Sequence, residues 1–456
     1  MNDKKVYAMD FGTTFSEAGY LGEDGRPEII KNPSGERKLQ TAVRFENGDG
    51  KQFGGSAARA APVYPDSVLE KFKPELDRTE TKFSVDGKEL TPLDVSELFY
   101  GHIKDSIEEA TGDTADRAVI TIPAYFHDTG YQIMKQGAEN AGFKIERIMR
   151  EPASAAVGYA INNPLHDQET VMVYDLGGGT FDVSLLEVTE KNGSPRFDII
   201  GNQGKTDLGG RDFTRKIVDQ VFTKEFSNKF GFDPSDKPEV EAEWLKRAED
   251  LKKGLSESES DIDYVRAEGE TIPLDLTRGE FEELIEPEVN ETLEITEKLL
   301  NETSKEKSDI DRLVLVGGTT RTPLIKEKLK DFTGLKPEKG VDPDLAVVTG
   351  AILIAGSKGN RTIRDQNGVR VPLLASEVRD VTSHGIGIKA VNPDTGEEYH
   401  EILIQKGEPL RAVGKQDFHP LQDNADTVEL TIIEGNSRDL DDCKILQEGY
   451  QLEVST

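Results

Sequence analysis

Cysteine is almost absent from this chain of 456 residues, because Cys443 is the only one. A single thiol cannot form an intrachain disulfide, which excludes the disulfide-stapled frameworks of small secreted proteins. The chain also lacks an apolar run of about 18 residues, the length that a membrane-spanning helix needs. Its first residues do not resemble a signal peptide, and its six histidines lack the spacing of metal ligands. These absences predict a protein of the reducing cytoplasm without a membrane partner.

Positive charge is also scarce relative to negative charge. The chain has 56 Lys and Arg against 87 Asp and Glu, a formal net charge of −31. Such a surface repels nucleic-acid backbones and anionic lipid headgroups, so neither is expected as a partner. The length is sufficient for two to four domain-sized units.

The most informative stretch of the chain is residues 170–188. An apolar β-run, 171–174, ends at Asp175 and three glycines, and a second β-run, 180–188, follows at once. These runs predict a hairpin whose glycine turn lets backbone N–H groups form a nest for phosphate. A carboxylate on each side, Asp175 and Asp182, suits a hard cation such as Mg²⁺ beside the phosphate. The alternative is an ordinary glycine-rich hairpin with solvated acids.

A similar stretch occurs near the N-terminus. Asp10 and Asp175 lie 165 residues apart, a distance typical of one domain. The residues at matching positions are Gly12, Thr13 and Thr14 in the first copy and Gly177, Gly178 and Gly179 in the second. The repeat predicts a duplicated fold in which two phosphate loops face one cleft.

The remaining segments alternate between helical and strand periodicity. Helices are expected over residues 93–110, 153–160, 240–256, 276–300 and 345–355, and core strands over 118–122, 145–149 and 310–316. Asp128 is expected to cap a helix that ends near Ala141, and Asp342-Pro343-Asp344 to cap the helix 345–355. The small residues of helices 153–160 and 345–355 predict close packing, as a hinge would need. After residue 360 the pattern changes to short strands, at 385–389, 401–405 and 427–434.

Two charged segments are candidates for the phosphate site. Lys71 and Lys73 could reach a phosphate, although a solvated pair fits the residues equally well. Glu151 opens the small-residue helix, where it could be a buried functional carboxylate or a helix-start glutamate favoured by the dipole.

Taken together, these motifs resemble the DnaK-type seventy-kilodalton heat-shock chaperones of the actin/hexokinase ATPase superfamily. The motifs that carry the resemblance are D-F-G-T-T from Asp10, A-V-I-T-I-P-A-Y-F from Ala118, E-P-A-S-A-A from Glu151, D-L-G-G-G-T-F-D from Asp175, L-G-G-R-D-F from Leu208, V-L-V-G-G-T-T-R-T-P from Val314 and D-P-D from Asp342. They occur in family order between Asp10 and Asp344. The triple-glycine and V-G-G-T-T-R-T-P runs are the most specific.

The resemblance implies an α/β fold with an actin-like (ribonuclease H-like) nucleotide-binding domain at residues 1–375. Lobe I would comprise about 1–163 and 343–375, and lobe II about 164–342. A linker at 376–382 would lead to a shortened, incomplete β-sandwich module for substrate at 383–456.

The resemblance also implies ATP or ADP with Mg²⁺ in the cleft, with K⁺ as a further candidate. The implied catalytic residues are Lys73 (Lys71 in reserve), Glu151, Thr180 and Asp182, and the implied metal-site residues are Asp10, Asp175 and Asp182, largely through water. The implied phosphate-side residues are Gly12, Thr13, Thr14, Gly177, Gly178, Gly179, Thr180, Gly209 and Gly210. The implied adenosine-side residues are Glu249, Lys252, Lys253, Ser256, Gly317, Gly318, Arg321 and Asp344.

Three departures from the family pattern bear on function. Lys253 replaces the arginine that stacks on adenine, and lysine has no planar face for stacking. Tyr131 replaces an arginine that resembles part of an interdomain relay. The linker segment 377–381 lacks the family's leucine run.

The first hypothesis is an ATP-hydrolysing chaperone whose nucleotide state gates a β module for extended or unfolded peptide. It would work with a J-type co-chaperone and a nucleotide-exchange factor. The alternative is a divergent ATP-binding switch for a dedicated partner, without general peptide binding. A small-molecule kinase would need a general base and a substrate pocket that the sequence lacks, and the β tail argues against an actin-like filament former.

Overall fold

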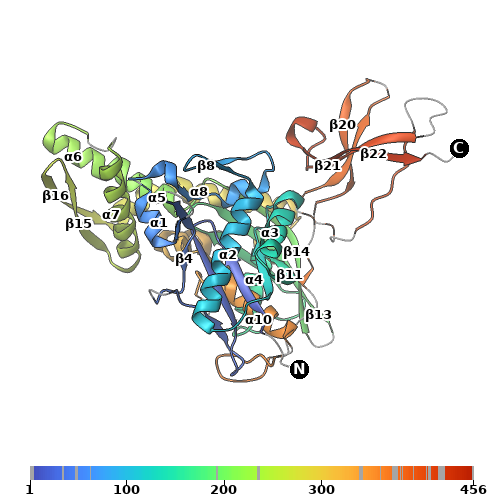
Figure 1. Ribbon diagram of the computed structural model, residues 1–456, viewed down its shortest axis with the longest axis horizontal. Helices are drawn as coiled ribbons and strands as arrows, with labels where there is room; N and C mark the ends of the chain where they lie inside the picture. The colour runs from blue at the N-terminus through green and yellow to red at the C-terminus, as the bar shows by residue number, and fades with distance from the viewer. Residues whose placement is uncertain are drawn as a thin grey trace.

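The computed structural model of the protein describes most of the chain. The residues described are 5–32, 35–46, 50–61, 63–191, 194–233, 237–337, 342–359, 361–371, 378–379, 382, 384–393, 395–406, 408, 412–419 and 427–453. Two large sheets form its body, and a smaller sheet stands at one end (Figure 1).

The N-terminal part is built on a mixed sheet, called the β1 sheet below, with strand order β11-β10-β1-β2-β3 and β4 pairing with β2. Its strands are β1 (Tyr7–Phe11), β2 (Phe15–Leu21), β3 (Pro27–Ile29), β4 (Leu39–Gln40), β10 (Arg117–Ile122) and β11 (Lys144–Arg150). The antiparallel β1–β2 pair confirms the first predicted hairpin. Helices α2 (Pro92–Thr111) and α3 (Asp128–Asn140) pack on one face, where Phe11, Phe72, Phe99 and Tyr100 form an aromatic core.

Small elements extend the β1 sheet. They are β5 (Ala42–Phe45), β6 (Lys51–Phe53) and β7 (Val68–Glu70), which form a three-stranded sheet, the hairpin β8 (Phe83–Val85) and β9 (Lys88–Leu90), helix α1 (Gly55–Ala60), and the 3₁₀ turns Pro65–Ser67 and Lys73–Asp77.

The second large sheet, called the β12 sheet, has strand order β17-β12-β13-β14-β18. Its strands are β12 (Thr170–Leu176), β13 (Phe181–Lys191), β14 (Ser194–Lys205), β17 (Arg312–Val316) and β18 (Val378–Arg379). The antiparallel β12–β13 pair confirms the second predicted hairpin. Helices α8 (Arg278–Glu302) and α9 (Pro323–Thr333) pack against this sheet. The expected start of helix 276–300 was wrong by two residues, because Leu276 belongs to the preceding strand.

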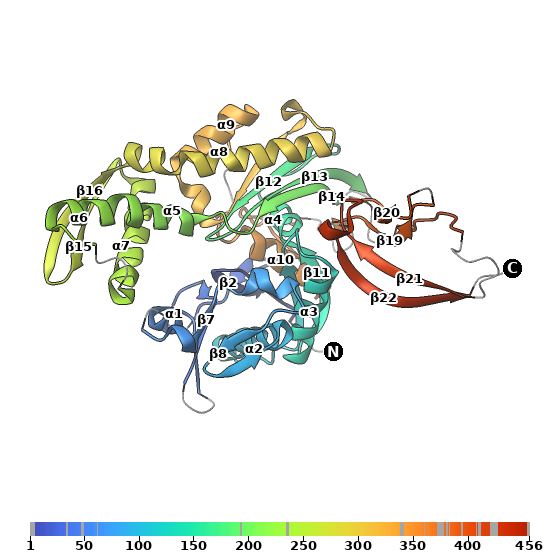
Figure 2. The ribbon, with the colours of Figure 1, turned by 90° about the horizontal axis from the view of Figure 1, so that it is seen from above.

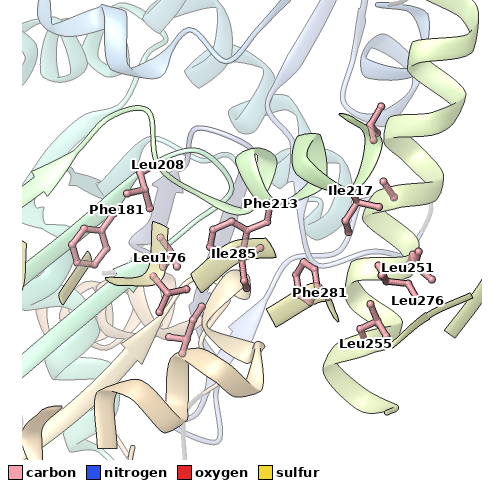
Figure 3. Packing of buried hydrophobic residues seen from close by; sticks show 14 of the residues in the cluster. Leu176, Phe181, Leu208, Phe213, Ile217, Leu251, Leu255, Leu276, Phe281 and Ile285 are labelled. Atoms are coloured by element: carbon pink, nitrogen blue, oxygen red, sulfur yellow. The ribbon is translucent and has the colours of Figure 1, made fainter. Parts of the chain in front are cut away.

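A helical extension with one hairpin continues from the β12 sheet. Its elements are α5 (Gly210–Ile217), a π-helical turn (Val218–Phe222), α6 (Thr223–Phe230), α7 (Pro238–Glu257), β15 (Ser260–Ala267) and β16 (Glu270–Thr277). Figure 3 shows apolar side chains of β12, β13, α5, α7 and α8 pointing toward one another in one continuous core. Trp244 of α7 is completely buried there against Phe222 and Phe226, and its indole N–H donates to the Arg266 carbonyl at 3.0 Å.

Helices α4 (Glu151–Ala160) and α10 (Ala346–Lys358) cross each other between the two large sheets (Figure 2). A Cβ at Gly158 would lie 2.5 Å from the Ala346 carbonyl oxygen, and one at Gly350 would lie 1.8 Å from that of Ser154. These are the two small-residue segments, and the close packing predicted for them is confirmed. Both helices share one core with β-strands of each sheet.

The C-terminal part forms one antiparallel sheet with strand order β20-β19-β21-β22. Its strands are β19 (Ile386–Val391), β20 (Glu398–Ile404), β21 (Thr427–Glu434) and β22 (Lys444–Glu453). Lys444 Nζ donates to the Asp77 carbonyl at 2.7 Å, and the rings of His127 and His384 stack at 4.0 Å. Of the predicted linker, residues 376, 377, 380 and 381 lie outside the described residues, and 378–379 form β18, parallel to β14.

Two capping predictions were wrong. Helix α3 begins at Asp128 itself, and the Asp77 carboxylate, from another segment, accepts the N–H groups of His127 and Gly130. Helix α10 begins after Leu345 without a side-chain cap, because Asp344 pairs with basic side chains instead. No helix in the described ranges is long and apolar enough to cross a membrane.

Candidate functional site

A cavity lies between the turn of the β1–β2 hairpin and the turn of the β12–β13 hairpin. It encloses about 730 Å³ of space, part of which is continuous with solvent. Most of the predicted phosphate, metal and catalytic residues line it: Asp10, Gly12, Thr13, Thr14, Lys73, Glu151, Asp175, Gly177, Gly178, Thr180, Asp182, Gly317, Gly318 and Asp344. Residues from segments far apart in the sequence therefore converge on one cavity.

The two hairpin turns meet at the cavity through glycine. A Cβ at Gly178 would lie 2.5 Å from Thr14 Oγ1, so a larger residue would require the Thr14 side chain to move. A Cβ at Gly209 would lie 2.5 Å from the Gly179 nitrogen, and Gly210 donates its N–H to the Gly177 carbonyl at 3.0 Å. The loop before α5 thus rests directly on the triple-glycine turn and supports its shape.

Carboxylates from both hairpins line the cavity. Asp10 accepts a hydrogen bond from Thr121 Oγ1 at 2.7 Å. Burial, followed by the charge of Glu151, raises the pKa of Asp10 to about 6 and that of Asp175 to about 8. Burial and the neighbouring Asp175 also raise the pKa of Asp182 well above its ordinary value. Burial, more than any single neighbour, therefore disfavours the charged forms of these three carboxylates.

Lys73 is the buried lysine of the site. Its Nζ lies 2.6 Å from Glu151 Oε1, and its side chain is only 3% exposed. Burial alone would lower the pKa of Lys73, but the charges of Glu151 and Asp10 outweigh burial and raise it. Lys71 instead has an exposed side chain that pairs with Glu70 at 2.9 Å. Geometry thus favours Lys73 over Lys71 as the lysine of the cavity.

The remaining predicted residues do not line the cavity. These are Gly179, Gly209, Gly210, Glu249, Lys252, Lys253, Ser256 and Arg321. Lys252 Nζ donates to the Gly210 carbonyl at 2.7 Å and to Glu249 Oε2 at 2.5 Å, which ties α7 to the glycine loop. Ser256 Oγ donates to the Lys252 carbonyl at 3.4 Å.

Two cations of this group differ in their setting. Lys253 has a largely exposed side chain that reaches Glu249 Oε1 at 3.2 Å. Arg321 is held by Asp344 Oδ2 at 2.9 Å and Asp342 Oδ1 at 2.5 Å. Arg321 is therefore fixed in place, whereas Lys253 projects toward solvent.

The sequence interpretation missed several residues at the cavity. Phe15, Glu17, Lys38 and Tyr125 line it, and Arg211 Nε donates to the Gly178 carbonyl at 3.2 Å. One of them had a signal in the repeat. Glu17 follows Asp10 by the same seven positions that separate Asp182 from Asp175, and both pairs face each other across their hairpins.

The donor set fits a phosphate group accompanied by a hard cation. Asp182 Oδ1 and Thr14 Oγ1 are buried and have no hydrogen-bond partner among the described residues. Carboxylate oxygens are the ligands that Mg²⁺ prefers. Within the described ranges no three acidic, His or Cys side chains converge to chelate an ion unaided, so a bound cation would also draw ligands from water or phosphate.

A cavity with two glycine turns, a buried lysine and a carboxylate cluster is the kind of site that binds a nucleoside polyphosphate. The comparison with protein families agrees with this class. A model of the family described as Hsp70 protein matches residues 71–453, more than four fifths of the chain. The protein belongs to the Hsp70 family, a family of ATP-binding chaperones that hydrolyse ATP.

Proposed function

We propose that the protein is an ATP-dependent chaperone of the DnaK type. It hydrolyses ATP to ADP slowly, with Mg²⁺, and uses the nucleotide state to change the peptide affinity of the C-terminal sheet. The observation that carries the proposal is the cavity between two glycine hairpins, lined by Lys73, Glu151 and the acidic cluster. Family membership supports it independently.

The proposed architecture is the actin-like one, with lobes at 1–163 plus 343–375 and at 164–342. The linker at 376–382 and the incomplete β-sandwich module at 383–456 follow. Support comes from the pair of large sheets, each carrying one glycine hairpin, and from the α4–α10 crossing between them.

In this proposal the phosphates lie between the turn with Thr13 and Thr14 and the turn from Gly177 to Thr180. Asp10, Asp175 and Asp182 would surround the Mg²⁺ site, and bound Mg²⁺ would supply neutralisation of phosphate charge. Lys73 would place a positive charge beside the γ-phosphate, because Glu151 fixes its direction at 2.6 Å. Glu151 and Thr180 would orient the attacking water.

The adenosine would lie against Gly317 and Gly318, with Arg321 and α7 on its two sides. Gly317 has φ 82° and its N–H donates to the Pro343 carbonyl at 3.0 Å, so the turn is both glycine-dependent and anchored. Lys253 pairs with Glu249 Oε1 at 3.2 Å, and its ammonium group has no planar face that could stack on a base. This supports a weaker grip on the base than an arginine would give.

In this proposal, communication between the cavity and the C-terminal sheet would pass through the contacts that join the sheet and the linker to the body. Lys444 reaches the Asp77 carbonyl, Lys406 Nζ donates to the Asn202 carbonyl at 3.0 Å, and β18 pairs with β14. A J-type co-chaperone and an exchange factor would be the protein partners. The single cysteine supports the cytoplasm as the compartment.

The alternative is an ATP-binding switch for one dedicated partner. Tyr131, Lys253 and the altered linker favour it, because these positions depart from the family pattern that couples ATP to peptide binding. The discriminating experiment is steady-state ATPase activity with and without an extended apolar peptide.

We expect peptide to stimulate turnover, and a charged peptide of equal length serves as the control. ATP turnover that no apolar peptide changes would favour the dedicated switch. Absence of ATP binding would overturn both readings of the cavity.

A further inference from the structure

A lysine that the family pattern did not single out lies in the cavity. We propose that Lys38 is a second phosphate-binding cation of the nucleotide site, in addition to Lys73. The inference rests on the proposed function, because it requires a nucleoside polyphosphate in the cavity. It names the ligand group that Lys38 recognises, namely the charged phosphate chain rather than the base or sugar.

The backbone of Lys38 is fastened to the first glycine turn. Lys38 directly precedes β4, which pairs with β2 at the start of the strand. Three residues after Lys38, Thr41 donates its N–H to the Thr14 carbonyl and its hydroxyl to the Gly12 carbonyl, both at 2.9 Å. Because the turn and this segment are joined on both sides of Thr13, Lys38 keeps a fixed position relative to the proposed phosphate turn.

The side chain of Lys38 forms part of the cavity wall. Its Nζ lies 2.5 Å from Asp344 Oδ1 and 5.5 Å from the centre of the Phe15 ring, and the side chain is 30% exposed. It lines the same cavity as Thr13 and Thr14. The ammonium group is therefore accessible from the cavity and not enclosed by protein.

Asp344 would keep a cationic partner if Lys38 left it. Arg321 also contacts Asp344, through Nη2 at 2.9 Å and Nε at 3.3 Å. An unpaired, partly buried carboxylate would be strongly unfavourable. Since Arg321 continues to pair with Asp344, the lysine can exchange its carboxylate for a phosphate oxygen without leaving that carboxylate alone.

The charges that line the cavity explain why a bound phosphate chain would need Lys38. The described residues that line the cavity include two lysines and no arginine. Lys73 is already committed to Glu151 at 2.6 Å. Six carboxylates line the same walls: Asp10, Glu17, Glu151, Asp175, Asp182 and Asp344. An anion with several charges that enters this cavity needs every cation available there. Lys38 is the cation that can be released by its carboxylate partner.

A purely structural role predicts something different. If Lys38 only offsets Glu17 and Asp344, its removal disturbs the pocket equally for all ligands with the same nucleoside. If it binds phosphate, the loss grows with the number of phosphates. The comparison of adenosine, AMP, ADP and ATP therefore separates the two roles.

The test is titration calorimetry of the full chain, with Mg²⁺, using these four ligands on the wild type, Lys38→Gln and Lys38→Arg. A charge-assisted hydrogen bond corresponds to about 10–100-fold in affinity. We expect Lys38→Gln to weaken ATP and ADP by that factor and adenosine by less than about 2-fold, and Lys38→Arg to retain most of the ATP affinity. Lys31→Gln, at an exposed lysine outside the cavity, is the matched control and should leave all four affinities unchanged.

Lys38→Gln keeps a hydrogen-bond donor for Asp344, so the variant should still fold. Thermal melting of each variant verifies that it is folded. Equal losses for adenosine and ATP, or no loss for any ligand, would overturn the assignment of Lys38 while leaving the proposed function intact. A wild type that binds none of the four ligands would instead overturn the proposed function, and this assignment with it.

Discussion

Replacing Gly350 with alanine tests the close contact between helices α4 and α10. The added Cβ would lie 1.8 Å from the Ser154 carbonyl oxygen, where real Cβ contacts essentially never fall below 3.0 Å. Helices α4 and α10 must therefore separate by roughly 1 Å, since the opposing atom is backbone and cannot rotate away. Overpacking of this kind costs about 1–3 kcal/mol, and the usual gain from replacing a helical glycine, about 0.5–1 kcal/mol, offsets only part of it.

We expect Gly350→Ala to lower the free energy of unfolding by about 1–2 kcal/mol. The assay is urea unfolding followed by far-ultraviolet circular dichroism. The control is Gly101→Ala in α2, where a Cβ would meet nothing within 4 Å. That change should leave the protein equally stable or up to about 1 kcal/mol more stable. Equal midpoints for the two variants would refute the inference that the helices are in full contact at Gly350.

Three further predictions concern the buried lysine of the cavity, a buried histidine of helix α2, and the lysine of helix α7 that is proposed to face the adenine base. Lys73→Ala should slow ATP hydrolysis by about 100-fold or more while ADP affinity changes only a few-fold, and Lys71→Ala, at the exposed neighbour, should match the wild type in both assays. Burial lowers the pKa of His102 from 6.5 to about 4, so the unfolded chain binds the proton first as the pH falls. The free energy of unfolding should decrease by up to about 3 kcal/mol as the pH falls from 6.5 to 4. In His102→Gln, the urea midpoint should depend less on pH over this range. Lys253→Arg should tighten adenosine binding about 2–5-fold in calorimetry, and an unchanged affinity would mean that α7 does not face the base.

The hairpins and their glycine turns could be predicted from local sequence, because both signals are local. An apolar run that ends at an acid and glycines specifies a strand and a tight turn, and both β1–β2 and β12–β13 follow that rule. The close α4–α10 contact was predictable for the same reason, since a helix made of small residues can bury its surface well only by packing very closely against another element. The family motifs then identified most residues that line the cavity.

The residues missed at the site depend on pairing between distant segments. Lys38 enters the cavity because Thr41 bonds to Gly12 and Thr14, which no periodicity reveals. The cap of α3 was assigned to Asp128, but the carboxylate that fulfils the role is Asp77, 51 positions upstream of the first helical residue. The resemblance put Lys73 first with Lys71 in reserve, and the structure shows that the Lys73 side chain is the one that turns inward.

Strands with mixed polarity were also missed. The hairpin β15–β16 alternates exposed and buried side chains, and strand β22 is exposed along most of its length, so all three strands carry many charged and polar residues. Their pairing, and not their composition, makes them strands.

The burial of Trp244 makes it an intrinsic fluorescence probe of this protein. It is the sole tryptophan of the chain, and its indole is sealed by Phe222 and Phe226 in the extension formed by α5, α6 and α7. Its emission therefore reports solvent entry into that extension alone, whereas circular dichroism averages over every helix. If the emission shifts to the red at a lower urea concentration than the dichroism changes, the extension opens as a separate cooperative unit. Because the same helix carries Glu249 and Lys252, a nucleotide that stabilises α7 would move the fluorescence midpoint first.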